Sequence, residues 1–328
     1  MYDLLDMTCL PVDIVQRIDG YFPIEGDTYI RIENIDWQPG GSGNVFILYE
    51  RLGGRCLPYG PIGDDIYGEW LKRTYEQLGI ETKGLILTEN FETQVSNCLI
   101  DKGGSHTFAA TLPTADYVDR KLLDSFIAEC RGFYLSGYSM HGDSSQPMIQ
   151  DCMYACRQFR EKGKQLFFDP GPVVGDIDKK LMKEILELSD IVSFNNEEAE
   201  IYTGYKDEEA AARAIAALTE GITIVKAGAK GCFVIDRDKK EKWYPGFRVK
   251  KIDTMGAGDS FFAAVMYGYQ HGWDIDSYMT AANAAGAVKA KTPGTGVHVP
   301  TVASIRELLQ ENGLVWIEED GIVRIIKS

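Results

Sequence analysis

Residues 253–260 have the sequence DTMGAGDS, and the apolar segment FFAAV follows at once at 261–265. Two glycines separated by one small residue allow a tight backbone turn, and the apolar run predicts the start of a buried helix. The unbonded N–H groups of the turn and the positive end of the helix dipole would then face one point, where a phosphate could sit. This stretch therefore predicts an anion-binding loop at a helix N-terminus.

Asp259 is the unexpected residue of this loop, because a carboxylate repels the anion that the loop would attract. The conflict is resolved if Asp259 removes a proton from a hydroxyl that attacks the phosphate. Taken alone, an aspartate at this position is also consistent with an ordinary N-cap in a strand-to-helix turn. The rest of the chain has to decide between these interpretations.

Four further motifs lie elsewhere in the chain. They are GGSGNV at 40–45, GPIGDDIYG at 60–68, NNEE at 195–198 directly after an apolar strand, and KAGAKG at 226–231 at the end of another. Together with DTMGAGD at 253–259, they resemble the signatures of the PfkB carbohydrate kinases, the ribokinase-like family, in the family's order. The resemblance extends over nearly all of the 328 residues.

Apolar runs of strand length alternate with helix-patterned segments in the second half of the chain. The runs are 133–135, 166–168, 191–192, 222–225 and 232–235, and the helix-patterned segments are 178–188 and 208–218. The alternation predicts an α/β fold with a doubly wound, mainly parallel sheet covered by helices, and the ribokinase-like resemblance implies the same fold. Ligands of such sheets bind beyond the carboxyl ends of the strands, so Asn195, Gly228 and Gly256 are expected to converge on one crevice.

Two segments do not fit a helix-covered strand. Residues 14–37 are extended with polar alternation, and residues 93–100 alternate before the turn DKGG at 101–104. They predict a small sheet that projects from the core, which the resemblance interprets as a lid over the substrate, although a functionless edge hairpin fits the same pattern. The predicted domains are a core of 1–12, 39–90 and 112–328 and a β lid of 13–38 and 91–111. Residues 314–317 and 322–326 predict an added C-terminal hairpin.

The resemblance implies ATP-dependent phosphoryl transfer to a hydroxyl of a sugar or a sugar-like alcohol, with Asp259 as the general base. It also implies a backbone anion hole at Gly256, Ala257 and Gly258, and a site for ATP and magnesium. The nucleotide residues would be Lys226, Gly228, Gly231, Asn283, Asn195 and Glu198, of which Asn195 and Glu198 would hold Mg²⁺ through water. The substrate residues would be Asp13, Gly40, Gly41 and Asn44. Asp253 would belong to a monovalent-cation site of the kind that binds K⁺.

Several of these residues also have ordinary structural interpretations. Asn195 and Glu198 fit a capped helix start, the segment 226–231 fits a tight β-turn, and Asn283 fits a buried helix residue with a satisfied amide. Trp37, Tyr138, Phe108 and His106 are candidate walls of the substrate pocket, but such residues are more often core or surface.

The substrate is not named by the motifs. Pro11 stands where ribokinases carry an asparagine for the sugar, so ribose is not favoured. The glycine pair does not align with Asn44 without a one-residue shift, which leaves open which backbone groups would touch the substrate. A nucleoside kinase is the main alternative. A catalytically silent nucleotide-binding regulator belongs to a different class, but a pure binder gains nothing from a carboxylate such as Asp259 beside a phosphate.

Composition limits the partners. A formal net charge of -15 argues against a nucleic acid or an anionic membrane, and no segment has the pattern of a signal peptide or a membrane span, so we expect a cytoplasmic protein. Seven cysteines without zinc-type pairs indicate a reducing compartment, and Cys152 and Cys156 are expected to be buried thiols rather than metal ligands. A homodimer formed through the lid is a further expectation from the resemblance.

Overall fold

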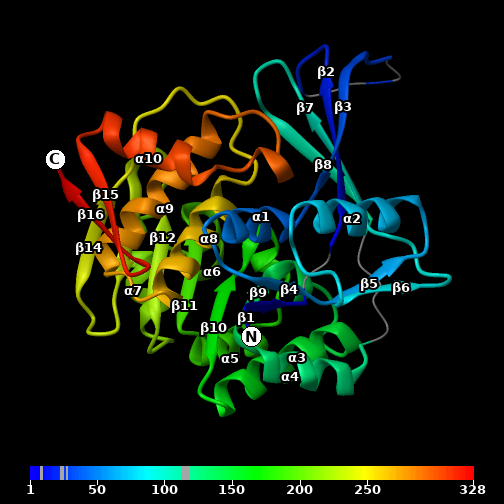
Figure 1. Cartoon of the computed structure of the whole chain (residues 1–328), viewed down its shortest axis with the longest axis horizontal. Coiled ribbons are helices and arrows are strands. Elements are labelled where there is room, and N and C mark those ends of the chain that lie inside the picture. Colours follow the sequence, from blue (N-terminus) through cyan, green and yellow to red (C-terminus); the bar gives the residue numbers. More distant parts are fainter. Residues whose placement is uncertain (8–9, 23–25, 27–28, 112–117) are drawn as a thin grey trace.

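The computed structural model describes residues 1–7, 10–22, 26, 29–111 and 118–328. An eight-stranded sheet forms its centre (Figure 1). The strands of this sheet are β1 (Tyr2–Asp6), β4 (Cys56–Pro58), β9 (Cys130–Ser136), β10 (Gln165–Asp169), β11 (Ile191–Asn195), β12 (Ile222–Lys226), β13 (Gly231–Ile235) and β14 (Glu241–Pro245). Their order is β14-β13-β12-β11-β10-β9-β1-β4. All neighbours from β4 to β12 pair in parallel, and β13 and β14 complete the sheet in antiparallel pairing.

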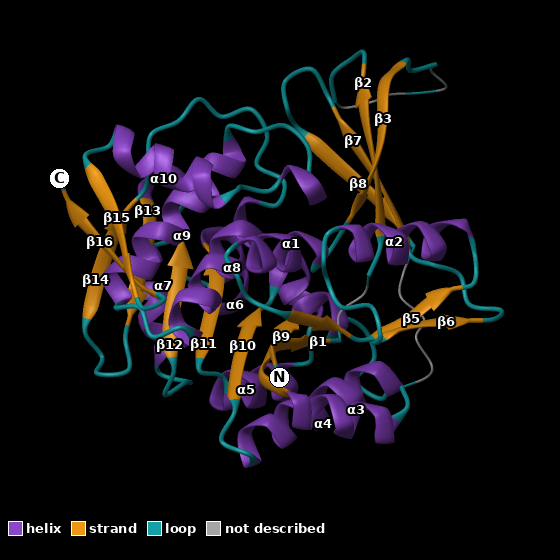
Figure 2. Cartoon of the chain, in the orientation of Figure 1, coloured by secondary structure: helices purple, strands orange, loops and turns teal. Residues whose placement is uncertain are grey.

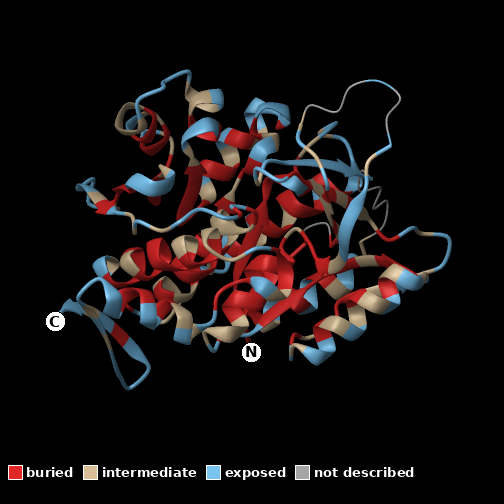
Figure 3. Cartoon of the chain, turned by 90° about the horizontal axis from the view of Figure 1, so that it is seen from above, coloured by how far each residue is buried: buried red, intermediate tan, exposed pale blue. Residues whose placement is uncertain are grey.

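Helices cover both faces of the sheet (Figure 2). Neighbouring strand residues point to opposite faces, so Phe167 and Ile224 belong to one buried cluster while Phe168 and Val225 belong to the other. The first cluster includes residues of α1 (Gly43–Arg51), α2 (Ile66–Gln77), α8 (Ala257–Gln270), α9 (Ile275–Ala290) and α10 (Val302–Glu311). The second includes residues of α3 (Arg120–Glu129), α4 (Pro147–Glu161), α5 (Lys179–Leu188), α6 (Asn196–Thr203) and α7 (Glu208–Ala216). Figure 3 shows the buried residues gathered in the interior between these layers.

A separate sheet of four strands projects from the core (Figure 1). It contains β2 (Val12–Ile18), β3 (Ile32–Pro39), β7 (Val95–Ile100) and β8 (His106–Ala110), in the order β3-β2-β7-β8. Only the β2–β7 pair is parallel. Asp101 closes the predicted turn after β7, because its Oδ1 accepts the N–H groups of Gly103 and Ser105 at 2.8 Å each. We call these four strands the lid sheet.

The two faces of the lid sheet differ. Ser96, Cys98 and Ile100 alternate as buried residues with half-buried neighbours along β7. The register places Cys98 beside Val15 and Phe108, so Asp13, two residues before Val15, lies on the same face. Because Val15, Cys98 and Ile100 form a cluster with Met255 of the anion-binding loop, this face is turned toward the core.

Most of the predicted elements are confirmed. The predicted strands lie within β9 to β13, and the two predicted helices are α5 and α7, which begin after the caps Asp178 and Asp207. The C-terminal hairpin is β15 (Leu314–Glu319) with β16 (Ile322–Lys327), and a short parallel pair joins β5 (Gly60–Gly63) to β6 (Leu85–Thr88). The predicted domain limits stay a prediction, and residues 23–25 and 27–28 of the lid and 112–117 of the core lie outside the described residues.

Two expectations from composition can be compared with the structure. Cys152 and Cys156 are buried in α4, where burial raises the pKa of the Cys156 thiol far above its usual range, as expected for a packed thiol. Among the helices of the described residues, none is both long and apolar enough to cross a bilayer.

Candidate active site

The loop before α8 presents free backbone donors. Gly256 is the N-cap of α8 and has φ 76°, in the left-handed region that favours glycine. The N–H groups of Gly256, Gly258 and Asp259 donate to no group of the described residues, whereas the Ala257 N–H donates to the Thr254 carbonyl at 3.1 Å. The predicted Ala257 donor is therefore engaged in this conformation. Three donors at the positive end of the helix remain for an anion.

Asp259 lies in the first turn of α8 and is held by Asn44. The Asn44 amide donates from Nδ2 to Oδ2 of Asp259 at 2.8 Å. Burial and the negative charge of Asp169 raise the pKa of Asp259 to about 6, although the Asn44 hydrogen bond and the charges of Lys226 and Lys289 oppose the rise. A carboxyl with this pKa is mostly ionised at pH 7 and can accept a proton.

Asn44 is itself fixed from the other side. Its Oδ1 accepts hydrogen bonds from the Thr295 hydroxyl at 2.6 Å and from the Gly296 N–H at 2.7 Å. Asn44 is buried in the first turn of α1, which packs against α8. The sequence predicts Asn44 as a substrate residue. In the structure its amide orients Asp259, and the second N–H of the amide donates to no group of the described residues.

Asp13 and the glycines before α1 form the lid side of the site. Asp13 is buried in β2, and its carboxylate accepts no hydrogen bond from the described residues. Burial and the nearby charge of Asp259 raise the pKa of Asp13 to about 7. A Cβ added to Gly40 would lie 2.1 Å from Oδ1 of Asp13, so the backbone approaches this carboxylate as closely as only glycine permits. Gly41 has φ 53° in the turn before α1.

A buried ion pair lies beside the anion-binding loop. Nζ of Lys226, at the end of β12, is 2.7 Å from Oδ2 of Asp169, at the end of β10. Burial disfavours the ammonium, but the charges of Asp169 and Glu198 outweigh it and raise the pKa of Lys226. A Cβ added to Gly258 would lie 3.6 Å from Nζ of Lys226. Lys226, the cation that is predicted near a phosphate, therefore lies beside the anion-binding loop.

Asn195 and Glu198 form a reciprocal cap at the start of α6. The Asn195 N–H donates to Oε2 of Glu198 at 2.7 Å, and the Glu198 N–H donates to Oδ1 of Asn195 at 2.8 Å. Burial and the charge of Asp169 raise the pKa of Glu198 to about 7, while Lys226 opposes the rise. The capped-helix interpretation is confirmed, and it places the Glu198 carboxylate among the charges of the site.

The other predicted nucleotide residues lie next to β12 and β13. Gly228 has φ 56° and is exposed, with no atom within 4 Å of an added Cβ. Gly231 is buried, and a Cβ there would lie 2.0 Å from the Tyr244 carbonyl oxygen, so close strand packing accounts for this glycine. Asn283 is buried in α9 and donates to the Tyr244 carbonyl at 3.2 Å, as in the satisfied-amide interpretation.

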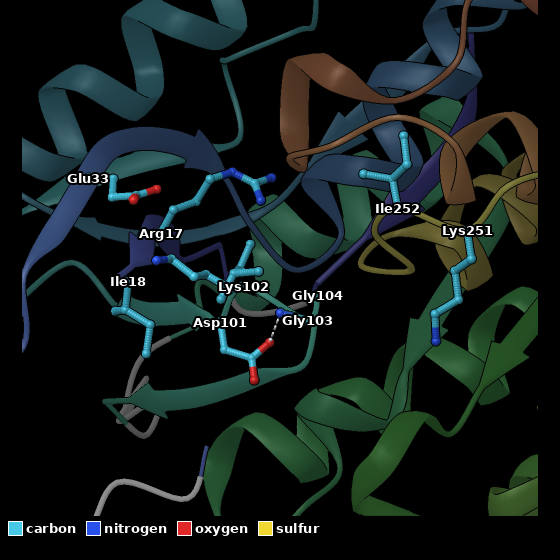
Figure 4. A pocket seen from close by; sticks show the side chains of 10 residues that line it. Arg17, Ile18, Glu33, Asp101, Lys102, Gly103, Gly104, Lys251 and Ile252 are labelled. Carbon is cyan, nitrogen blue, oxygen red and sulfur yellow. Dashed lines mark hydrogen bonds between the residues drawn. The ribbon is translucent and has the colours of Figure 1, made fainter. Parts of the chain in front are cut away.

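Asp253 is almost wholly buried at the start of the loop. Its Oδ1 accepts the Met255 N–H at 3.0 Å and its Oδ2 accepts the Gly294 N–H at 2.9 Å. Nη2 of Arg17, from the lid strand β2, lies 3.8 Å from Oδ2. Arg17 also lines a pocket of ≈ 410 Å³ between the lid sheet and residues Lys251 and Ile252 (Figure 4). Hydrogen-bond donors and a guanidinium therefore already surround the Asp253 carboxylate.

The four candidate aromatic walls separate into three groups. Trp37 packs against Tyr67 at a ring distance of 4.9 Å and against α2, as a core residue does. His106 and Phe108 lie on the core-facing side of the exposed edge strand β8. Tyr138 is 42% exposed. Burial is the main cause of its raised pKa, and the negative charges of Asp259 and Asp13 are the next causes, so its ring lies near both carboxylates.

Sequence reasoning missed three contributors to the site. Asp169 follows the apolar run 166–168, and this position after a buried strand was the signal that could have identified it. Thr295 and Lys289 carry no such signal, because a loop threonine and a helix lysine are common in any chain.

The assembled groups suit chemistry on an anion. The carboxylates of Asp169, Glu198 and Asp259 act on the ammonium of Lys226, and Asp13 faces Asp259, so the carboxylates outnumber the ammonium groups of Lys226 and Lys289. Within the described residues, no group of three or more His, Cys, Asp or Glu side chains could hold a metal ion by itself. A divalent cation would therefore need oxygens from a ligand or from water as well.

Comparisons with known proteins give a consistent result. A family model described as pfkB family carbohydrate kinase matches residues 9–302. The aminoimidazole riboside kinase of Salmonella typhimurium is 27% identical over 289 residues, covering 84% of this chain and 89% of that protein. Probable fructokinase-5 of Arabidopsis thaliana is 27% identical over 316 residues, covering 91% and 94%. The crystal structure of fructokinase from Vibrio cholerae O395, with fructose, ADP and calcium bound, superposes with a TM-score of 0.75 at 22% identity, covering 94% and 99%.

Asp13→Asn should stabilise the ligand-free protein, and more so at high pH. The raised pKa of Asp13 means that the wild-type fold loses stability as pH rises from about 4 to about 7, because the carboxyl ionises in the unfolded chain over this range while burial keeps it protonated in the folded protein. The gain in unfolding free energy should therefore be about 1 kcal/mol or more larger near pH 8 than near pH 5. Denaturant melts at the two pH values measure it. Asp64→Asn, at an exposed position, is the matched control, and equal gains at both pH values would contradict the assignment.

Proposed function

The chain belongs to the pfkB family of carbohydrate kinases, and we propose that it transfers the terminal phosphate of ATP to a hydroxyl of a sugar or a sugar-like alcohol. The observation that carries this proposal is the position of Asp259. It lies in the first turn of α8 between free N–H donors, with Oδ2 held by Asn44 and with Oδ1 accepting no hydrogen bond from the described residues. A carboxylate in this setting repels a phosphate unless it serves the nucleophile.

In the proposed reaction Asp259 accepts the proton of the attacking hydroxyl. The Asn44 hydrogen bond keeps the carboxylate in one orientation, and Thr295 and Gly296 keep the Asn44 amide in place. Because the pKa of Asp259 is about 6, the group is ionised at pH 7 but is basic enough to take the proton as the new P–O bond forms.

The transferring phosphoryl group would lie against the loop. The N–H groups of Gly256, Gly258 and Asp259 converge at the helix N-terminus and would stabilise its oxygens as their charge shifts. Lys226 adds a positive charge next to Gly258, and its ion pair with Asp169 fixes the ammonium there. The backbone donors are rigid, so little reorganisation is needed when the charge develops.

The charges of the site fit a nucleotide that is bound together with Mg²⁺. Four carboxylates outnumber the two ammonium groups of Lys226 and Lys289 and would repel free ATP, whereas an Mg²⁺–ATP complex brings its own compensating charge. When bound, Mg²⁺ neutralises the phosphate oxygens. Glu198 and Asn195 would hold water of its coordination sphere, since their own oxygens cap α6. Exposed Gly228 leaves room for the nucleotide near Lys226.

The acceptor would lie between the lid and the core. Asp13 offers a buried carboxyl that accepts no hydrogen bond from the described residues, and its pKa responds to the charge of Asp259, so a molecule with two hydroxyl groups can contact both. Tyr138 and the edge residues His106 and Phe108 could also stack a base. A nucleoside kinase is therefore the second candidate, and relatives of both kinds occur, namely a fructokinase and an aminoimidazole riboside kinase.

Measuring ATP consumption over a panel of sugars, sugar acids, polyols and nucleosides tests the function. We expect Mg²⁺-dependent turnover with one class of acceptor and an acid limb of kcat/KM near pH 6, because Asp259 must be ionised.

Asp259→Asn should lower kcat by about 10²–10⁴-fold with ATP affinity retained. Nucleotide binding without turnover on any acceptor would instead indicate a silent regulator, and more than a tenth of wild-type kcat in Asp259→Asn would reject the base.

Glu198→Gln should raise the Mg²⁺ concentration for half-maximal rate about tenfold, because a charged oxygen leaves the metal's surroundings while the glutamine amide can still cap α6. A magnesium titration at saturating ATP measures this. Glu197→Gln is the matched control, since Glu197 is the exposed neighbour on the same turn. If both variants titrate like wild type, Glu198 has only its capping role.

The outer face of the lid sheet supports the proposed homodimer. Ile35 is 57% exposed, and the register places it on the face opposite Asp13, together with Leu99 and near Ile14. Exposed apolar side chains such as Ile35, on a face that also carries the hydrogen-bonded pair Gln16 and Asn97, are stabilised when a second copy covers them. Ile35→Glu should therefore convert a dimer to a monomer in sedimentation velocity. Ile201→Glu, at an equally exposed residue of α6, should not, and a monomeric wild type would exclude the dimer.

A further inference from the structure

Lys289 is a charged residue for which the proposed reaction has no direct use. It lies in the last turn of α9 and its side chain is fully buried, at 0% exposure. Nζ donates to the Thr292 carbonyl at 3.0 Å, and Lys289 has no ion-pair partner among the residues of the structure. Burying an ammonium without a paired carboxylate is strongly unfavourable, so this charge needs a compensating role.

The surroundings of Lys289 are the anion-binding loop and its base. Burial lowers the pKa of Lys289, but the carboxylates of Asp253 and Asp259 oppose this, and Arg17 is the other charged group that acts on it. The ammonium therefore lies within electrostatic reach of both ends of the loop 253–259. Through the Thr292 carbonyl it also contacts the segment 290–296, whose Gly296 N–H fixes Asn44 and, through Asn44, Asp259.

Asp253 is the residue expected to bind a monovalent cation, and its surroundings do not fit one. Each of its carboxylate oxygens already accepts a backbone N–H, and Arg17 lies 3.8 Å from Oδ2. The nearby Ala290 carbonyl accepts the N–H groups of Ile252 at 2.8 Å and of Asp253 at 3.1 Å. K⁺ is bound by several oxygens that face it without competing donors, whereas here both Asp253 oxygens and the Ala290 carbonyl accept N–H groups and a guanidinium lies beside Oδ2.

We infer that the buried ammonium of Lys289 is a fixed internal cation that does the work of a bound monovalent ion, so that phosphoryl transfer by this chain needs no K⁺. The inference rests on the proposed function for its catalytic part. Lys289 touches neither nucleotide nor acceptor, and it is a positioning residue. Its bond to the Thr292 carbonyl orders the segment 290–296, and its charge offsets Asp253 beneath the loop that binds the phosphate.

The first test uses the wild-type protein. At a constant ionic strength of about 0.1 M, the rate should agree within about twofold in potassium, sodium and choline chloride. The melting temperature should likewise show no increase specific to K⁺. A rate or a melting temperature that is clearly higher in potassium than in sodium and choline chloride would overturn the inference. If no acceptor is turned over at all, the proposed function has failed, and the melting experiment still tests the internal cation.

The second test removes the ammonium. Lys289→Ala leaves space and unpaired oxygens, so the variant should lose about tenfold or more in kcat and should regain about fivefold with K⁺ but not with choline. Its melting temperature should also become K⁺-dependent, which a merely structural lysine would not produce. Lys291→Ala, two residues further along the chain, is the control and should stay insensitive to the cation. A folded Lys289→Ala with wild-type kcat and no response to K⁺ would overturn the inference.

If Lys289→Ala does not fold, Lys289→Met replaces it, because methionine retains the side-chain volume. This variant should show the loss of kcat without cation rescue. Wild-type kcat in Lys289→Met would overturn the inference.

Discussion

The hydrogen bond from Asn44 to Asp259 joins two residues that are 215 positions apart. It exists only because α1 and α8 pack together on the same face of the central sheet, where their apolar residues share one buried cluster. A hydrogen bond to a charged group contributes about 1.5–3 kcal/mol, but its importance here is geometric. It determines that Oδ2 of Asp259 is held while Oδ1 can accept a proton. The hydrogen bonds from Thr295 and Gly296 to Asn44 prevent the Asn44 amide from rotating.

Charge imposes the second constraint. The pKa values of Asp13, Glu198 and Asp259 are all raised, because each carboxyl is buried and faces another negative group. This arrangement costs stability in the ligand-free state, as is common where side chains are placed for function rather than for folding. The charges of Lys226 and Lys289 reduce the cost for Asp259; Lys226 is itself ion-paired with Asp169, whereas Lys289 forms no ion pair with the described residues. A cation that arrives with the nucleotide would supply the remaining compensation.

Contiguous features were predictable from sequence, and dispersed ones were not. The turn at Gly256 and the base candidate at Asp259 lie in one segment whose residue types carry the chemistry, and the strands are visible as apolar runs. Asp169, Thr295 and Lys289 reach the site only because the sheet order and the packing of α9 bring them there. The sequence also does not show which hydrogen-bond donors and acceptors are already engaged within the protein. The Ala257 N–H is taken by Thr254 and the oxygens of Asp253 are occupied, although both residues match the family's motif.

The lid sheet and the loop before α8 are connected by two charge contacts of opposite sign. Asp13 and Arg17 lie on the same face of β2, separated by four residues, and face Asp259 and Asp253 respectively. The first contact is repulsive when both carboxyls are ionised, and the second is attractive. The attraction draws this end of the lid sheet toward the core, and the repulsion at the other end falls when a hydrogen-bond donor or a cation lies between the two carboxylates. The two contacts along one strand therefore act in opposite directions: the ion pair of Arg17 draws the lid sheet toward the core, and the two carboxylates push it away when both are ionised.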